Sequence, residues 1–135
     1  MKRKSNIIAA LAFCMYLASV AVICFMHGSR LPNITGTWMS IPVDKVVHAV
    51  MFFPFIPLAY FTFKRDKTRR FASMFMLKLL LAFGAGTAYL TEIIQEKYCH
   101  RTYETADFVA DCIGLGCGFM LVTAWIFIKT SRNRR

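Results

Sequence analysis

Side chains that could do chemistry are concentrated at two places in this sequence. The first place is a short run with Asp44, Lys45 and His48 at the start of an apolar segment. The second is residues 92–111, which hold five of the seven acidic residues of the chain and Arg101. Carboxylates, an imidazole and basic groups at close quarters can exchange protons or bind a charged ligand. The elements around them must therefore bring two distant segments together.

Helical spacing places these side chains on common faces, because residues three or four positions apart are neighbours on an α-helix. Three pairs have this spacing: Asp44 and His48, Glu92 and Gln95, and Asp107 and Asp111. Gly114 and Gly118 continue the face of the last pair, and glycines four apart let a neighbouring helix approach closely. We therefore expect the two aspartates to point into a helix bundle.

The composition is that of a membrane protein. Hydrophobic residues make up 57% of the chain and charged residues only 18%, and the mean hydropathy is +0.48. The net charge of +10 comes from short basic blocks between apolar segments, so we predict no nucleic-acid partner. Four of the five cysteines lie in apolar segments, which excludes a disulfide framework.

Four apolar segments are long enough to cross a hydrocarbon core of about 30 Å. We predict membrane spans at about residues 7–26, 46–63, 71–94 and 106–128. The first is expected to be a retained helix, because its apolar run continues past the small residues that could form a cleavage site. The sequence thus predicts an all-α, integral membrane four-helix bundle in a single domain, residues 1–135.

The ends of these spans carry further signals. Pro54 and Pro57 predict a bent second span, because proline removes backbone hydrogen bonds. Asp44 is placed to cap the start of that span. Residues 27–43 and 95–105 are expected to be loops, from their turn-forming and polar residues.

Counting basic residues gives an orientation. Twelve of the seventeen Lys and Arg residues lie in the N-terminus, the 64–70 turn and the C-terminal tail. The positive-inside rule then predicts that both termini are cytoplasmic. On this topology the two polar clusters share the outer face of the membrane.

Each polar residue also has an ordinary structural explanation. Asp44 can serve only as a helix cap, and His48 can simply bond to Asp44 or to a neighbouring helix. Glu96 and Glu104 are expected to be solvated charges. Cys99 and His100 could join His48 and Asp107 around zinc, but no CxxC or HExxH spacing supports this. We therefore predict no metal and no cofactor.

These residues make the chain resemble the VanZ-like family of small bacterial membrane proteins, named after a factor that confers low-level teicoplanin resistance. The matching elements are residues 44–48 (DKVVH), residues 92–95 (EIIQ), Arg101, and residues 107–114 (DFVADCIG) followed by Gly118. They occur in the family's order over residues 44–118. Asp111 stands where the family pattern usually has Asn. The resemblance implies a multi-pass protein of the bacterial inner (cytoplasmic) membrane, in the cell envelope, with glycopeptide tolerance in some members.

The sequence and the resemblance together predict a polar pocket at the outer face. Its expected ligand-binding residues are Asp44, Lys45, Gln95, Arg101, Asp107 and Asp111. If a reaction occurs there, His48 and Glu92 are the candidate acid/base pair. The expected partners are membrane lipids and a lipid-linked or peptidoglycan-related ligand, with Arg101 binding its phosphate or carboxylate.

Two other functions fit the same residues. The polar cluster could be a structural lock in a membrane scaffold without catalysis. Alternatively, carboxylates within the membrane could mark the path of a small ion-coupled transporter, which would need to form a homo-oligomer because it has only four spans.

Overall fold

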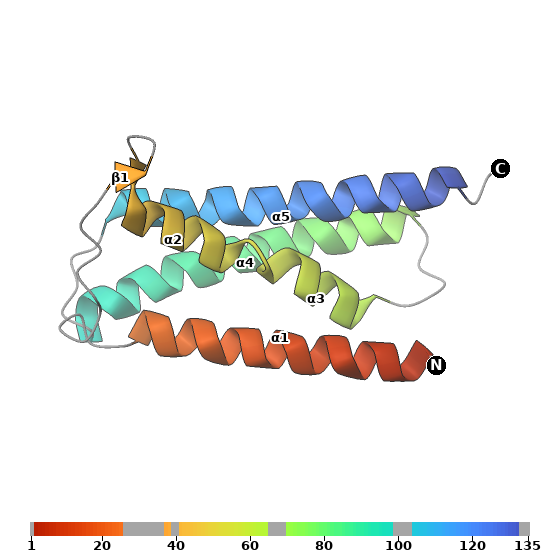
Figure 1. The fold of residues 1–135 in the computed structure, drawn as a ribbon, viewed down its shortest axis with the longest axis horizontal. Coiled ribbons are helices and arrows are strands. Elements are labelled where there is room, and N and C mark those ends of the chain that lie inside the picture. Colours follow the sequence, from red (N-terminus) through yellow and green to blue (C-terminus); the bar gives the residue numbers. More distant parts are fainter. Residues whose placement is uncertain (1, 26–36, 39–40, 65–69, 99–103, 133–135) are drawn as a thin grey trace.

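The computed structural model describes residues 2–25, 37–38, 41–64, 70–98 and 104–132. Its elements are α1 (Lys2–Phe25), β1 (Thr37–Trp38), β2 (Ile41–Pro42), α2 (Val43–Phe52), α3 (Phe55–Phe63), α4 (Arg70–Tyr98) and α5 (Thr105–Arg132). The helices run side by side along one long axis, and both termini lie at the same end of the bundle (Figure 1). The two short strands pair antiparallel at the other end, where β2 leads directly into α2.

Four segments are long and apolar enough to cross a membrane: Ile7–Phe25, Val43–Phe63, Arg70–Tyr98 and Thr105–Arg132. The predicted all-α four-helix membrane bundle is therefore confirmed. Some boundaries differ from the prediction. The predicted loop 27–43 contains β1 and β2, and α2 already begins at Val43. Helix α4 continues to Tyr98 although a loop was predicted from residue 95. The extra turn carries Gln95, whose buried side chain bonds to α1 and holds this part of α4 in the bundle.

The second span is bent, as its prolines predicted. It consists of α2 and α3, with a break at Phe53 and Pro54. Pro54 is the N-cap of α3 and Pro57 lies in the first turn. A proline there sacrifices no helical hydrogen bond, because the first N–H groups of a helix have no partner within it.

The prediction that Asp44 caps the second span was wrong. The N-cap residue of α2 is Pro42, with no side-chain hydrogen bond, and Asp44 lies within the first helical turn. The helix starts early because Pro42 ends β2 in an extended conformation and Val43 is already helical. The carboxylate of Asp44 still lies near the positive end of the helix dipole.

Helices α2 and α5 approach each other most closely at two glycines of α5. A methyl group added at Gly114 would collide with the backbone carbonyl oxygen of Ala49, and one added at Gly118 would lie 2.5 Å from that of Phe53. Gly116, by contrast, has open space where its side chain would be. The predicted close-packing face of Gly114 and Gly118 is thus confirmed. Gly114 packs against α2, and Gly118 packs against Phe53 and the start of α3.

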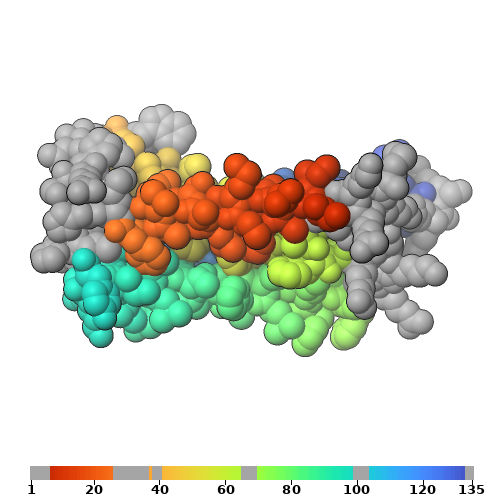
Figure 2. Space-filling model, turned by 90° about the horizontal axis from the view of Figure 1, so that it is seen from below, coloured from red at the N-terminus to blue at the C-terminus, as the bar shows by residue number. Residues whose placement is uncertain are grey.

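Helix α1 lies along the outside of the bundle, across α3 and α4 (Figure 2). Most of its described side chains are exposed or only partly buried, as expected for a helix that faces lipid. Hydrogen bonds between described residues help to hold it in place. The Tyr16 hydroxyl donates to the carbonyl of Met51 at 2.9 Å, and the Gln95 amide nitrogen donates to the carbonyl of Cys24 at 3.1 Å.

Candidate functional site

The two polar segments of the sequence meet at the end of the bundle opposite the termini (Figure 1). Helix α2 contributes its first two turns, α4 its last two turns and α5 its first two turns. We call the side chains that meet there the polar cluster: Asp44, Lys45, His48, Glu92, Glu104, Asp107 and Asp111. The predicted juxtaposition of the two segments at one end of the bundle is confirmed.

His48 is at the centre of the polar cluster and is only 5% exposed. Its Nδ1 atom lies 3.0 Å from Oδ1 of Asp111, which is a hydrogen-bond distance. Its Nε2 atom lies 3.6 Å from Oδ2 of Asp107, which is too long for a hydrogen bond. The histidine is therefore oriented by Asp111, and its second nitrogen lies on the side of Asp107.

Lys45 joins α2 to α5 through its ammonium group. The Nζ atom contacts Oδ1 of Asp107 and Oε2 of Glu104, and it lies 3.0 Å from Oδ2 of Asp44. The side chains of Lys45 and Asp107 are 15% and 8% exposed, whereas Asp44 and Glu104 are about half exposed. The ion pair with Asp107 is thus the buried member of this network and the one that fixes the two helices.

Glu92 enters the polar cluster from α4 and is only 2% exposed. One of its carboxylate oxygens lies close to a ring nitrogen of His48 and a carboxylate oxygen of Asp107. These three atoms are all within 4.8 Å of one another. The predicted acid/base pair of His48 and Glu92 is therefore brought together. Proton exchange between them would require hydrogen-bond reach, either direct or through one water molecule.

The described contact of Gln95 is with α1. Its side chain is buried, and its amide nitrogen donates to the Cys24 carbonyl near the end of α1. This bond helps to attach α1, and the predicted ligand-binding role of Gln95 stays a prediction. Arg101, the predicted anion-binding residue, lies outside the described residues.

One member of the polar cluster was not predicted as a site residue. Glu104 was interpreted as a solvated charge, but its carboxylate pairs with Lys45 although it is half exposed. The spacing of Glu104 and Asp107, three residues apart, was the available signal. Glu96, the other residue interpreted in this way, is exposed as predicted.

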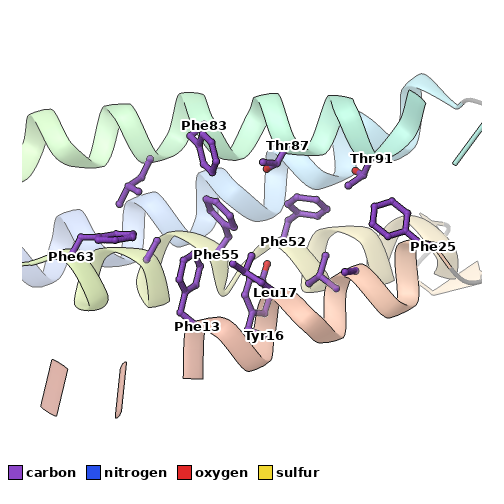
Figure 3. Close-up of a pocket in the computed structure, with 14 residues that line it drawn as sticks. Phe13, Tyr16, Leu17, Phe25, Phe52, Phe55, Phe63, Phe83, Thr87 and Thr91 are labelled. Carbon is purple, nitrogen blue, oxygen red and sulfur yellow. The ribbon is translucent and has the colours of Figure 1, made fainter. Parts of the chain in front are cut away.

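An apolar cavity of about 330 Å³ lies between α1, α3 and α4 (Figure 3). Thr91 and Phe25 lie at one end of the row of lining side chains and Phe63 lies at the other. Thr91 directly precedes Glu92 of the polar cluster in α4. The two threonine hydroxyls donate to carbonyls of their own helix at 2.7 Å, which leaves an apolar wall. The other large lining residues are Phe13, Tyr16, Leu17, Phe25, Phe55, Phe63, Leu80 and Phe83.

Comparison with known proteins gives no relative for this chain: no family model, curated protein or solved structure matches it. The class of protein that the fold defines is a multi-pass membrane protein with four candidate spans. The resemblance to the VanZ-like family rests on the short motifs alone.

Proposed function

We propose that this is a VanZ-like protein of the bacterial cytoplasmic membrane that binds a lipid-linked ligand of the cell envelope and contributes to glycopeptide tolerance. The hydrocarbon chain of the ligand occupies the cavity between α1, α3 and α4. Its polar head lies at the polar cluster, where Lys45 supplies positive charge. Arg101, which lies outside the described residues, is the proposed binding residue for its phosphate. Any proton transfer at this site would use His48 and Glu92.

The observation that carries the proposal is that the apolar cavity and the polar cluster adjoin. Thr91 lines the cavity and precedes Glu92 in α4, while Phe52 lines it one turn after His48 in α2. This arrangement matches a lipid, in which an apolar hydrocarbon chain is attached to a polar head group. The cavity also lies within the candidate membrane spans, so a chain can enter it directly from the bilayer.

The transporter alternative has less support, because an ion path needs polar groups along the bundle. Beyond Asp111, most of the described core toward the termini is apolar, including Leu115, Ile56, Leu77 and Val122. The buried side chains of Ser73 and Tyr60 carry hydroxyl groups there, but neither side chain is a carboxylic acid within the span. The scaffold alternative predicts the same helix contacts but no ligand. A direct test for the ligand therefore separates it from our proposal.

That test compares two matched substitutions in α1. Ala21 lines the cavity, so Ala21→Phe should fill it; Ala18 is exposed and does not line it, so Ala18→Phe is the control. We expect an isoprenoid phosphate lipid to co-purify in mild detergent with the wild type and with Ala18→Phe, and to be lost from Ala21→Phe. Mass spectrometry of the extracted lipid measures this.

Bulk phospholipid alone, in equal amounts from all three proteins, would favour the scaffold. The same variants should be compared for teicoplanin tolerance in cells that lack the native copy. We expect Ala21→Phe to be as sensitive as the deletion strain, and Ala18→Phe to behave as the wild type.

The proposal also requires the polar cluster to face outward. We expect single cysteines at positions 37 and 103 to react with a membrane-impermeant thiol reagent in intact cells or spheroplasts. Cysteines at positions 67 and 133 should stay unlabelled until the membrane is permeabilised, because the basic segments remain in the cytoplasm. All native cysteines are replaced in this background. Labelling at position 67 in intact cells would reverse the orientation and place the polar cluster inside.

A further inference from the structure

We propose that His48, Glu92 and Asp107 form a binding site for a divalent cation of the Zn²⁺ type. The three side chains are buried, come from three different helices, and each offers one donor atom within 4.8 Å of the others. One nitrogen and two oxygen donors are a ligand set that zinc accepts in proteins. Three protein ligands also leave one coordination position open to water or to a ligand oxygen.

The distance between His48 and Asp107 fits a shared ion better than a direct bond. The Nε2 and Oδ2 atoms are 3.6 Å apart, beyond hydrogen-bond distance. Two ligands of one tetrahedral zinc ion, each bound at about 2.0–2.2 Å, are separated by about 3.4 Å. The observed separation therefore needs only a small adjustment to accommodate an ion.

His48 and Asp107 are each oriented by a contact with another side chain. Asp111 contacts Nδ1 of His48, which leaves Nε2 as the ligand atom. Lys45 contacts Oδ1 of Asp107, which leaves Oδ2 on the side of the histidine. Metal-binding histidines in proteins are commonly oriented in this way by a carboxylate.

The negative charge of the buried carboxylates Asp107 and Asp111 also favours the binding of a cation. Asp111 is 0% exposed, and its Oδ2 atom has no hydrogen-bond partner among the described residues. Asp107 shares the ammonium of Lys45 with two other carboxylates. The described partner of the Asp111 carboxylate is the imidazole of His48. A divalent ion bound on the far side of that imidazole would lower the energy of the buried negative charge.

A second group of carboxylates does not form a comparable site. Asp44, Glu104 and Asp107 also place oxygen atoms close together, but all three contact the ammonium of Lys45. That ammonium already neutralises them in part. The imidazole of His48 distinguishes the proposed site and favours Zn²⁺ over Mg²⁺, which prefers oxygen ligands.

The metal site lies within the polar cluster of the proposed function, but it does not rest on that function, and its test uses no lipid. Tag-free protein in detergent is stripped with a chelator and titrated with Zn²⁺, and bound metal is counted by mass spectrometry after dialysis. We expect one Zn²⁺ per wild-type chain, and none retained by His48→Ala, Glu92→Gln or Asp107→Asn. Asp111→Asn should bind about 10–100-fold more weakly, because the amide orients the histidine without raising its basicity.

Matched controls make the outcome decisive. Glu96→Gln alters an exposed carboxylate one turn from Glu92, and we expect it to bind Zn²⁺ as the wild type does. The Cys99→Ser/His100→Ala double variant should also bind normally, because neither residue belongs to the proposed site. Zn²⁺ should raise the thermal unfolding midpoint of the wild type and of both controls, but not that of the ligand variants.

Absence of Zn²⁺ from the wild type would overturn the proposal. So would equal binding by Glu92→Gln and Glu96→Gln, or loss of binding in the Cys99→Ser/His100→Ala variant. If any ligand variant fails to fold, the milder Asp111→Asn still tests the site, because the hydrogen bond to His48 is retained while the affinity should fall.

Discussion

Gly114→Ala should destabilise the protein severely. The added methyl group would overlap the carbonyl oxygen of Ala49, which is backbone of α2 and cannot rotate away. Overpacking of a rigid core costs about 1–3 kcal/mol and occasionally more. We expect the upper end of this range, measured as a loss of unfolding free energy in detergent, because α2 must move away from α5 as a whole. The same movement would separate His48 from Asp111.

Gly116→Ala is the matched control for this prediction. Gly116 lies in the same helix, two residues away, and nothing lies within 4 Å of the place that an added methyl group would occupy. Alanine is favoured over glycine in a helix by about 1 kcal/mol, so this variant should be as stable as the wild type or slightly more so. Equal stability of the two variants would show that α2 and α5 are not in close contact.

Lys45→Met should have the second large effect. Methionine preserves much of the length and apolar surface of lysine but removes the ammonium that contacts the buried carboxylate of Asp107. Removing one partner of a buried ion pair destabilises a protein by about 3–5 kcal/mol. We expect a loss of this order in unfolding free energy. The pairs with Asp44 and Glu104 add little, because both carboxylates are about half exposed.

Two further variants separate this effect from a general loss of positive charge. Lys78 is exposed on α4, so Lys78→Met should leave stability unchanged. Adding Asp107→Asn to Lys45→Met should recover part of the loss, because a neutral amide no longer requires an ammonium beside it. The prediction fails if Lys45→Met and Lys78→Met are equally stable.

Two adjoining contacts fix α2 to α5: the close packing at Gly114 and the ion pair of Lys45 with Asp107. Gly114 allows the two backbones to approach, and the approach brings His48 and Lys45 within reach of Asp111 and Asp107. The buried charges in turn favour the close arrangement. Close packing and the polar cluster therefore depend on each other, and the metal site that we propose depends on both.

The sequence by itself determined the class of structure. Long apolar segments predicted four membrane spans, since the thickness of the hydrocarbon core dictates the length of a crossing helix. The three- and four-residue spacing of Asp107, Asp111, Gly114 and Gly118 correctly placed the acidic side chains on a packed face. Both inferences succeed because apolar length and helical periodicity are properties of a single chain segment.

The tertiary structure alone decided which side chains are partners. Spacing could not show that His48 faces Asp111, because they lie on different helices and their separation depends on how α2 crosses α5. Spacing likewise could not show that Gln95 bonds to α1 or that Lys45 joins α5. The zinc site considered from the sequence joined Cys99 and His100 to His48 and Asp107. The structure brings Glu92 to His48 and Asp107, and spacing could not predict this because Glu92 lies on a third helix.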